Sequence, residues 1–150
     1  MRRLAPVALV LLGPALWNGG CTTTAKGVDD CREIERARCA AAGACDVGID
    51  TKADQEACER FARDNCLHGL AAPVPRRSEL DSCLAAIAAA GDCSGKGVKT
   101  LAATCKIPTT DPQTTACQVV EDPELATACT FLLKEPPPEP VPVAKDAGGD

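Results

Sequence analysis

Large apolar side chains are scarce in this sequence. Among 150 residues there are two Phe, one Trp and no Tyr, and Trp17 lies within the first 20 residues. Roughly 110 residues remain for folding once both termini are set aside, which is enough for one small domain. Such a domain has a thin core, and small secreted domains of this kind depend on disulfides.

The charge balance excludes a further class of function. The net charge is −5, and Arg2 and Arg3 are the charged residues of the first 20, so the remainder carries −7. An acidic chain with few aromatics lacks the basic grooves and stacking platforms with which proteins bind nucleic acid. The composition also argues against adhesion to an anionic membrane by overall charge.

Patterns typical of catalysis and metal binding are missing as well. The closest cysteines, Cys39 and Cys45, have five residues between them, so no C-x-x-C pair suggests zinc or redox chemistry. The sole histidine, His68, precedes Gly69 at an expected helix end, and no serine stands in a nucleophile elbow. Residues 91–97 depart from a phosphate loop in spacing and in ending on Gly97. We therefore predict a protein without enzymatic activity, metal or cofactor.

The beginning of the chain carries the parts of a secretory signal. A basic start is followed by an apolar run from Leu4 to Trp17 and then by small residues. The run has about 14 residues and two prolines, whereas a membrane-spanning helix needs about 20. Residues 1–20 are therefore predicted to be a cleaved signal peptide.

The segment Asn18-Gly19-Gly20-Cys21 resembles the lipobox of bacterial lipoproteins. Gly19, Gly20 and Cys21 match that pattern, and Asn18 stands where the family typically has Leu. The resemblance covers residues 1–21 and implies that Cys21 carries a diacylglyceryl thioether and an acylated amine. More than one acyl chain is what stable anchoring requires. It implies a cell-envelope protein attached to a membrane, most often the outer membrane, and facing the periplasm or cell surface.

Two other interpretations of this leader stay open. Ordinary cleavage after Gly20 would leave Cys21 as a free or paired thiol. The Arg2-Arg3 pair also occurs in twin-arginine signals. In each case the chain after residue 20 lies in an oxidising compartment, where the other ten cysteines form an even set for disulfides.

The remaining sequence predicts an all-α fold. Residues 21–28 are expected to form a lipidated tether, 29–134 a cysteine-rich helical domain and 135–150 a disordered, acidic, Pro-rich tail. Helix signals predict five main segments. These are a helix at 31–42 capped by Asp29 or Asp30, one from Thr51 to Leu67, one from Ser78 to Ala90 ended by Gly91, and two beginning at Asp111-Pro112 and Asp122-Pro123. A short helix before Cys105 and an extended stretch over 106–110 complete the prediction.

Two of these segments share the pattern C-x-x-Φ-x-R-x-x-C, where Φ is Ile34 in the first and Phe61 in the second. Eight residues of helix rise about 12 Å, so the two cysteines of one segment are too far apart to bond each other. An antiparallel hairpin instead pairs the ends crosswise, Cys31 with Cys66 and Cys39 with Cys58. Ile34 and Phe61 would then fill the interface, and each bond contributes about 3–4 kcal/mol in the chain-entropy model. The main rival is a bond between Cys39 and Cys45.

Six cysteines remain, and their 15 possible connectivities stay open: Cys45, Cys83, Cys93, Cys105, Cys117 and Cys129. The last four are evenly spaced, with eleven residues between neighbours. This spacing suggests a second set of short bridged helices, although the intervening residues do not repeat.

The sequence therefore favours a non-enzymatic, lipid-anchored envelope protein with a structural or protein-interaction role. The membrane would be bound through the lipid on Cys21, and the protein partner is not indicated. The alternative is a secreted or periplasmic disulfide-rich binding module or inhibitor, released rather than anchored.

The Pro-rich tail gives the first testable prediction. Its prolines prevent helix formation and leave it little apolar surface to bury. Deleting residues 136–150 is therefore expected to leave the thermal midpoint of unfolding nearly unchanged. A drop of many degrees in a thermal scan would show instead that the tail packs on the domain.

Overall fold

The computed structural model describes residues 25–97 and 99–135. Within them the fold is all-α, as predicted, and no strand is present beyond two isolated bridges. Four α-helices are joined by short 3₁₀ helices. The α-helices are α1 (Val28–Ala41), α2 (Lys52–Asn65), α3 (Arg77–Ser94) and α4 (Ala116–Glu121), and the 3₁₀ helices are η1 (Ala42–Ala44), η2 (Cys66–His68), η3 (Ala102–Cys105), η4 (Pro123–Leu125) and η5 (Thr127–Leu133). The predicted signal peptide, Cys21 and the tail from residue 136 lie outside the described residues.

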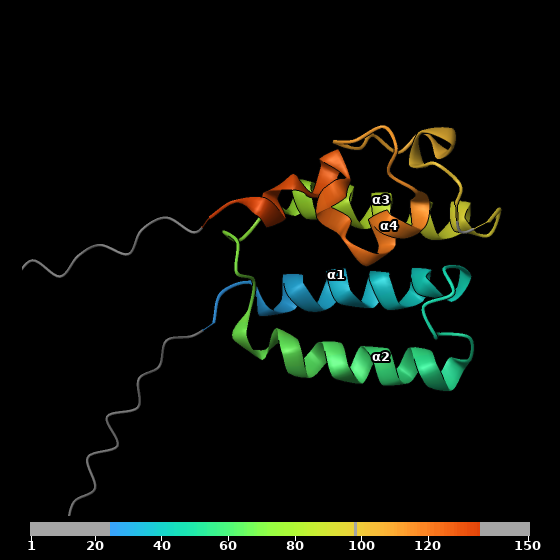
Figure 1. Cartoon of the computed structure of the whole chain (residues 1–150). Coiled ribbons are helices and arrows are strands. Elements are labelled where there is room, and N and C mark those ends of the chain that lie inside the picture. The colour runs from blue at the N-terminus through green and yellow to red at the C-terminus, as the bar shows by residue number, and fades with distance from the viewer. Residues whose placement is uncertain (1–24, 98, 136–150) are drawn as a thin grey trace, which may run out of the picture.

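The helices form three layers, with α1 in the middle. Figure 1 shows α2 along one side of α1, and α3 with α4 along the other. The largest buried side chains lie between α1, α3, α4 and η5; they include Ile34, Leu80, Ile87, Val119 and Phe131. The core of the described domain therefore lies on one side of the hairpin, and α2 stands outside it.

Helix α1 does not begin at an aspartate cap as predicted. It starts at Val28 after Gly27, which has a positive φ of 68° and no side-chain cap. The reason is a contact with the turn that follows α2: Leu70 N–H donates to the Lys26 carbonyl at 3.0 Å. Lys26, which lies within the predicted tether, is therefore bonded to the turn that follows α2.

Helix α2 begins with the predicted capping box. Thr51 Oγ1 accepts a hydrogen bond from Asp54 N at 3.2 Å, and the Asp54 carboxylate accepts from Thr51 N at 2.9 Å. The hydrogen bonds from Thr51 lower the pKa of Asp54. After α2, η2 ends at Gly69, where a side chain would collide with the Lys26 carbonyl oxygen. Backbone contacts between the start of α1 and the turn after α2 thus hold together the end of the hairpin that lies away from the loop joining α1 to α2.

Helix α3 differs from the prediction at both ends. Its first turn is capped by Glu79, whose carboxylate accepts from Arg76 N at 2.9 Å, and not by Ser78. The Arg76 side chain and backbone lower the pKa of Glu79 to about 2. The helix also continues through Gly91 to Ser94. Gly91 is needed for packing and does not end the helix, because a Cβ there would lie 2.6 Å from Ala41 Cβ.

Residues 106–135 contain less α-helix than predicted. Asp111 Oδ1 accepts from Gln113 N at 2.9 Å and forms a turn, so α4 starts only at Ala116, behind a Thr115–Gln118 capping box. Asp122-Pro123 begins 3₁₀ helices in place of the expected α-helix. The segment predicted to be extended contributes one bridge, between Thr109 and Ala126.

The close approach of α3 to α1 gives the second prediction. Gly91→Ala should destabilise the domain by about 1–3 kcal/mol, because neither Ala41 nor the backbone beside it can move aside freely. Gly95→Ala is the matched control: its Cβ would meet no atom nearer than 3.6 Å, and its φ is −55°. Urea unfolding with intact disulfides compares the two. Equal stability of both variants would contradict this packing.

Candidate functional site

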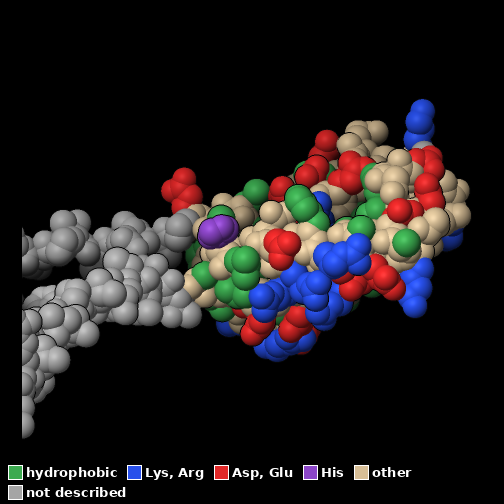
Figure 2. All heavy atoms as spheres, turned by 90° about the horizontal axis from the view of Figure 1, so that it is seen from below, with side chains coloured by type: hydrophobic (Ala, Val, Ile, Leu, Met, Phe, Trp, Pro, Cys, Tyr) green, Lys and Arg blue, Asp and Glu red, His purple; other side chains and the backbone are tan. Residues whose placement is uncertain are grey.

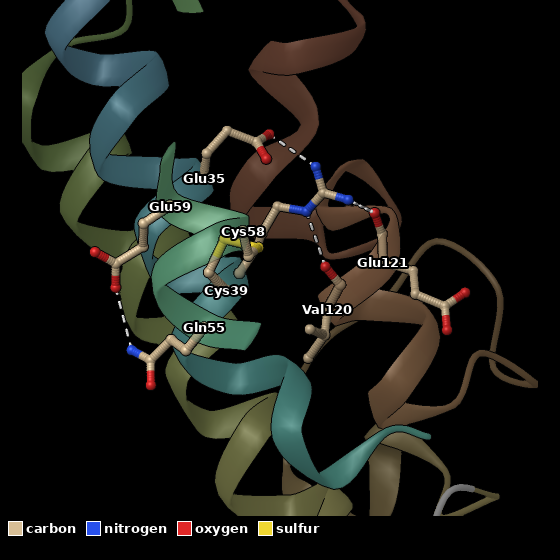
Figure 3. The surroundings of a disulfide bond; sticks show 8 residues. Glu35, Cys39, Gln55, Cys58, Glu59, Val120 and Glu121 are labelled. Carbon is tan, nitrogen blue, oxygen red and sulfur yellow. Dashed lines mark hydrogen bonds and ion pairs between the residues drawn. A yellow bond between two sulfur atoms is a disulfide. The ribbon is translucent and has the colours of Figure 1, made fainter. Parts of the chain in front are cut away.

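The hairpin of α1 and α2 is held by two crosswise disulfides. Cys31 bonds Cys66 with Cα atoms 5.7 Å apart, and Cys39 bonds Cys58 with Cα atoms 5.8 Å apart. The structure thus has both of the bonds that the antiparallel arrangement predicts. Figure 3 shows the second of them between the two helices. One bond lies at each end of the contact, so α2 can neither slide nor turn on α1.

The other six cysteines join more distant parts of the chain. Cys45 bonds Cys117, Cys83 bonds Cys129 and Cys93 bonds Cys105. The Cys45 bond excludes the rival Cys39–Cys45 pair in this structure. The evenly spaced cysteines are not a second set of bridged helices, because two of the four bond residues outside that set. Every described cysteine therefore has a partner within the domain.

The two equivalent apolar residues of the repeated pattern, Ile34 and Phe61, differ in burial. Ile34 is 3% exposed, as expected, whereas Phe61 is 70% exposed, so the prediction that Phe61 fills the interface is wrong. Both occupy the same place in the repeated pattern and point toward one side of the hairpin. On that side α3 and α4 cover α1 but stop short of α2. Ala62, which is 6% exposed, packs in the hairpin where Phe61 was expected.

An open groove of about 430 Å³ runs beside Phe61, between α1, α2 and the end of α4. We call it the Phe61 groove. Its apolar lining includes both hairpin disulfides and the side chains of Ala42, Val47, Ile49, Phe61 and Val120, and its polar lining is Glu35, Arg38, Asn65 and Glu121. Val47 is 40% exposed, so an apolar surface extends from α2 onto the loop before it.

The arginine of the groove, Arg38, is already bonded to neighbouring residues. Arg38 Nη1 pairs with Glu35 at 2.7 Å, Nε donates to the Val120 carbonyl at 3.0 Å, and Nη2 donates to the Glu121 carbonyl. Figure 3 labels the partners in these bonds, Glu35 on α1 and Val120 and Glu121 on α4. Because it satisfies carbonyls at the C-terminal end of α4, Arg38 fixes that helix against α1. The groove therefore offers a ligand mainly apolar side-chain surface to contact.

The polar residues considered for chemistry lie apart. His68 is exposed at the end of η2, Ser82 Oγ donates to the Ser78 carbonyl, and Ser94 Oγ donates to the Gly91 carbonyl. Residues 91–94 of the rejected phosphate loop are part of α3. Within the described ranges no three His, Cys, Asp or Glu side chains gather as a metal site would require. Sequence reasoning missed the groove, because its main signal, Phe61, has the spacing of a core residue.

Comparison of the chain with family models, with curated proteins and with solved structures finds no match. None of the helices in residues 25–97 and 99–135 is long and apolar enough to cross a membrane.

The unequal burial of the two phenylalanines gives the third prediction. Phe131→Ala should cost about 3–5 kcal/mol of unfolding free energy, because Phe131 is 4% exposed in the core. Phe61→Ala should change it by less than about 0.5 kcal/mol, because that side chain is mostly in solvent. Urea unfolding measures both. A similar loss in the two variants would show that Phe61 is part of the core.

Proposed function

We propose that the protein is a non-enzymatic cell-envelope protein, anchored to a membrane by lipid on Cys21, with a structural or protein-interaction role. One observation supports the proposed lipid anchor. The sequence has eleven cysteines, and the ten described ones form five bonds among themselves. The eleventh cysteine, Cys21, is the residue that the lipobox resemblance marks for modification.

The disulfides are relevant to the cellular compartment in which the protein is proposed to lie. Five disulfides in a chain of this size are compatible with a location outside the cytoplasm, where the redox balance lets them persist. Attachment to a bacterial membrane, and to the outer membrane in particular, is part of the proposal. It is supported by the leader and by the pairing of every described cysteine.

The Phe61 groove supports the interaction role. Exposed aromatic side chains in locked, apolar grooves are favoured anchor points in protein interfaces. Since each nitrogen of the Arg38 guanidinium already donates one hydrogen bond within the protein and most of the lining is apolar, the partner that the groove fits is a protein segment presenting an apolar stripe, such as one face of an amphipathic helix. Two disulfides hold the groove in shape before binding, which lowers the entropic cost of recognition.

The alternative is a released periplasmic or secreted binding module or inhibitor. It would use the same groove and the same disulfides but would lack lipid on Cys21. The two candidates are separated by the modification of that one residue.

The anchor gives the fourth prediction. Cys21→Ser should abolish incorporation of a fatty-acid probe and move the protein from the membrane fraction to the soluble fraction, because the thioether cannot form. Thr24→Ser is the control and should stay labelled and membrane-bound. An unlabelled wild-type protein would establish the released alternative, and a membrane-bound Cys21→Ser chain would contradict the anchor.

The groove gives the fifth prediction. A photo-crosslinking amino acid at position 61 should join the protein in cells to one partner, and mass spectrometry should map the bond to an apolar residue of an amphipathic segment. The control is the same crosslinker at Val74, which is 50% exposed and does not line the groove. Equal products at both positions, a polar partner segment or no product at position 61 would contradict the interaction role.

A further inference from the structure

Four arginines gather on the face of the hairpin opposite the Phe61 groove. Arg32 and Arg36 come from α1, and Arg60 and Arg63 come from α2; we call them the arginine cluster. Arg36 and Arg63 hold the same place in the repeated C-x-x-Φ-x-R-x-x-C pattern. Crosswise pairing of the two helices therefore turns both toward one face. Figure 2, viewed from the α2 side, shows basic side chains gathered beside acidic ones.

The cluster lines a hollow of about 300 Å³. Buried Ala62 lies among the lining residues, and its small side chain leaves room between the longer ones. Because the Cys31–Cys66 and Cys39–Cys58 bonds fix α1 against α2, the backbone positions of the four arginines are fixed as well. The hollow has the size of a small anion with its first waters.

The guanidinium groups have few partners of their own. The side chains of Arg36, Arg60 and Arg63 make no ion pair or hydrogen bond with any residue in the described ranges. Arg32 has one ion pair, 3.4 Å long, with a fully solvated Asp29, and its Nε is buried without an acceptor. The guanidinium groups of Arg36, Arg60 and Arg63 are therefore available to an acceptor that enters the hollow.

Two acids also line the hollow, but they are engaged along α2. Glu56 pairs with Lys52 at 3.9 Å, and Glu59 accepts from Gln55 Nε2 at 3.1 Å. Against four arginines they leave a positive surplus in a chain whose net charge is −5. The acidic composition argues against binding anions by overall charge. This face is locally basic and is an exception to the acidic character of the chain.

We propose that the arginine cluster is a binding site for a phosphate group. Guanidinium groups bind phosphate oxygens in pairs of parallel hydrogen bonds, which suits arginines converging from two helices. The phosphate belongs either to an anionic lipid headgroup or to a soluble phosphate compound. The binding chemistry is the same for both and does not depend on the lipid on Cys21.

The test uses the whole mature chain carrying Cys21→Ser, so that no anchor contributes. One arm titrates inorganic pyrophosphate and follows the amide NMR signals of α1 and α2. The other arm sediments the protein with vesicles of phosphatidylglycerol and phosphatidylcholine in equal parts, and with phosphatidylcholine alone. Binding in the first arm identifies a soluble phosphate, binding only to the phosphatidylglycerol vesicles identifies a headgroup, and either supports the site.

The variants make the result specific. Arg36→Gln with Arg63→Gln should weaken binding at least about tenfold, since each lost charged hydrogen bond is individually strong. Lys96→Gln with Lys99→Gln removes the same charge from exposed positions elsewhere and should change binding less than about twofold. Arg36→Lys with Arg63→Lys keeps the charge but loses the paired geometry. Its affinity should lie between that of the glutamine double variant at the same positions and that of the lysine control. Absence of binding in both arms, or an equal loss in the lysine control, would overturn the proposal.

Discussion

The two crosswise disulfides between α1 and α2 are the constraint on which the rest of the structure depends. Helix α2 lies outside the core, and its apolar Phe61 faces solvent, so packing alone holds it weakly. Cys31–Cys66 and Cys39–Cys58 fix it at both ends. The Phe61 groove and the arginine cluster are opposite faces of this one hairpin, and both lose their shape if the hairpin opens.

The remaining bonds tie the hairpin to the core. Cys45–Cys117 joins positions 72 residues apart and holds the loop after α1 against α4, while Arg38 binds the carbonyls that end α4. Bonds that close long loops reduce the entropy of the unfolded chain most in the chain-entropy model. A core that contains many small Ala and Cys side chains, and Phe131 as its buried aromatic, gains its rigidity in this way. That rigidity is what a preformed groove and a fixed arginine cluster require.

Local chemistry made part of this fold predictable from the sequence. The Thr51–Asp54 capping box and the crosswise hairpin follow from spacing within short segments. Features set by distant contacts were not predictable. Gly91 has the signature of a helix end until Ala41 is known to pack on it, and Phe61 has core spacing until α3 and α4 are seen to cover α1 alone. The pairing of the other six cysteines depends on how the helices pack against one another. The spacing of cysteines in the sequence does not determine that packing.

The most direct test of this account is peptide mapping of the mature protein without reduction. Trypsin places Cys31, Cys58 and Cys66 on separate peptides, and elastase cuts the alanine-rich stretch between Cys39 and Cys45. The account predicts that peptide 27–32 is joined to 64–76, and that the Cys39 fragment is joined to 53–60. A bond between Cys39 and Cys45, or between 27–32 and 53–60, would contradict the hairpin, and with it both of the faces assigned to it.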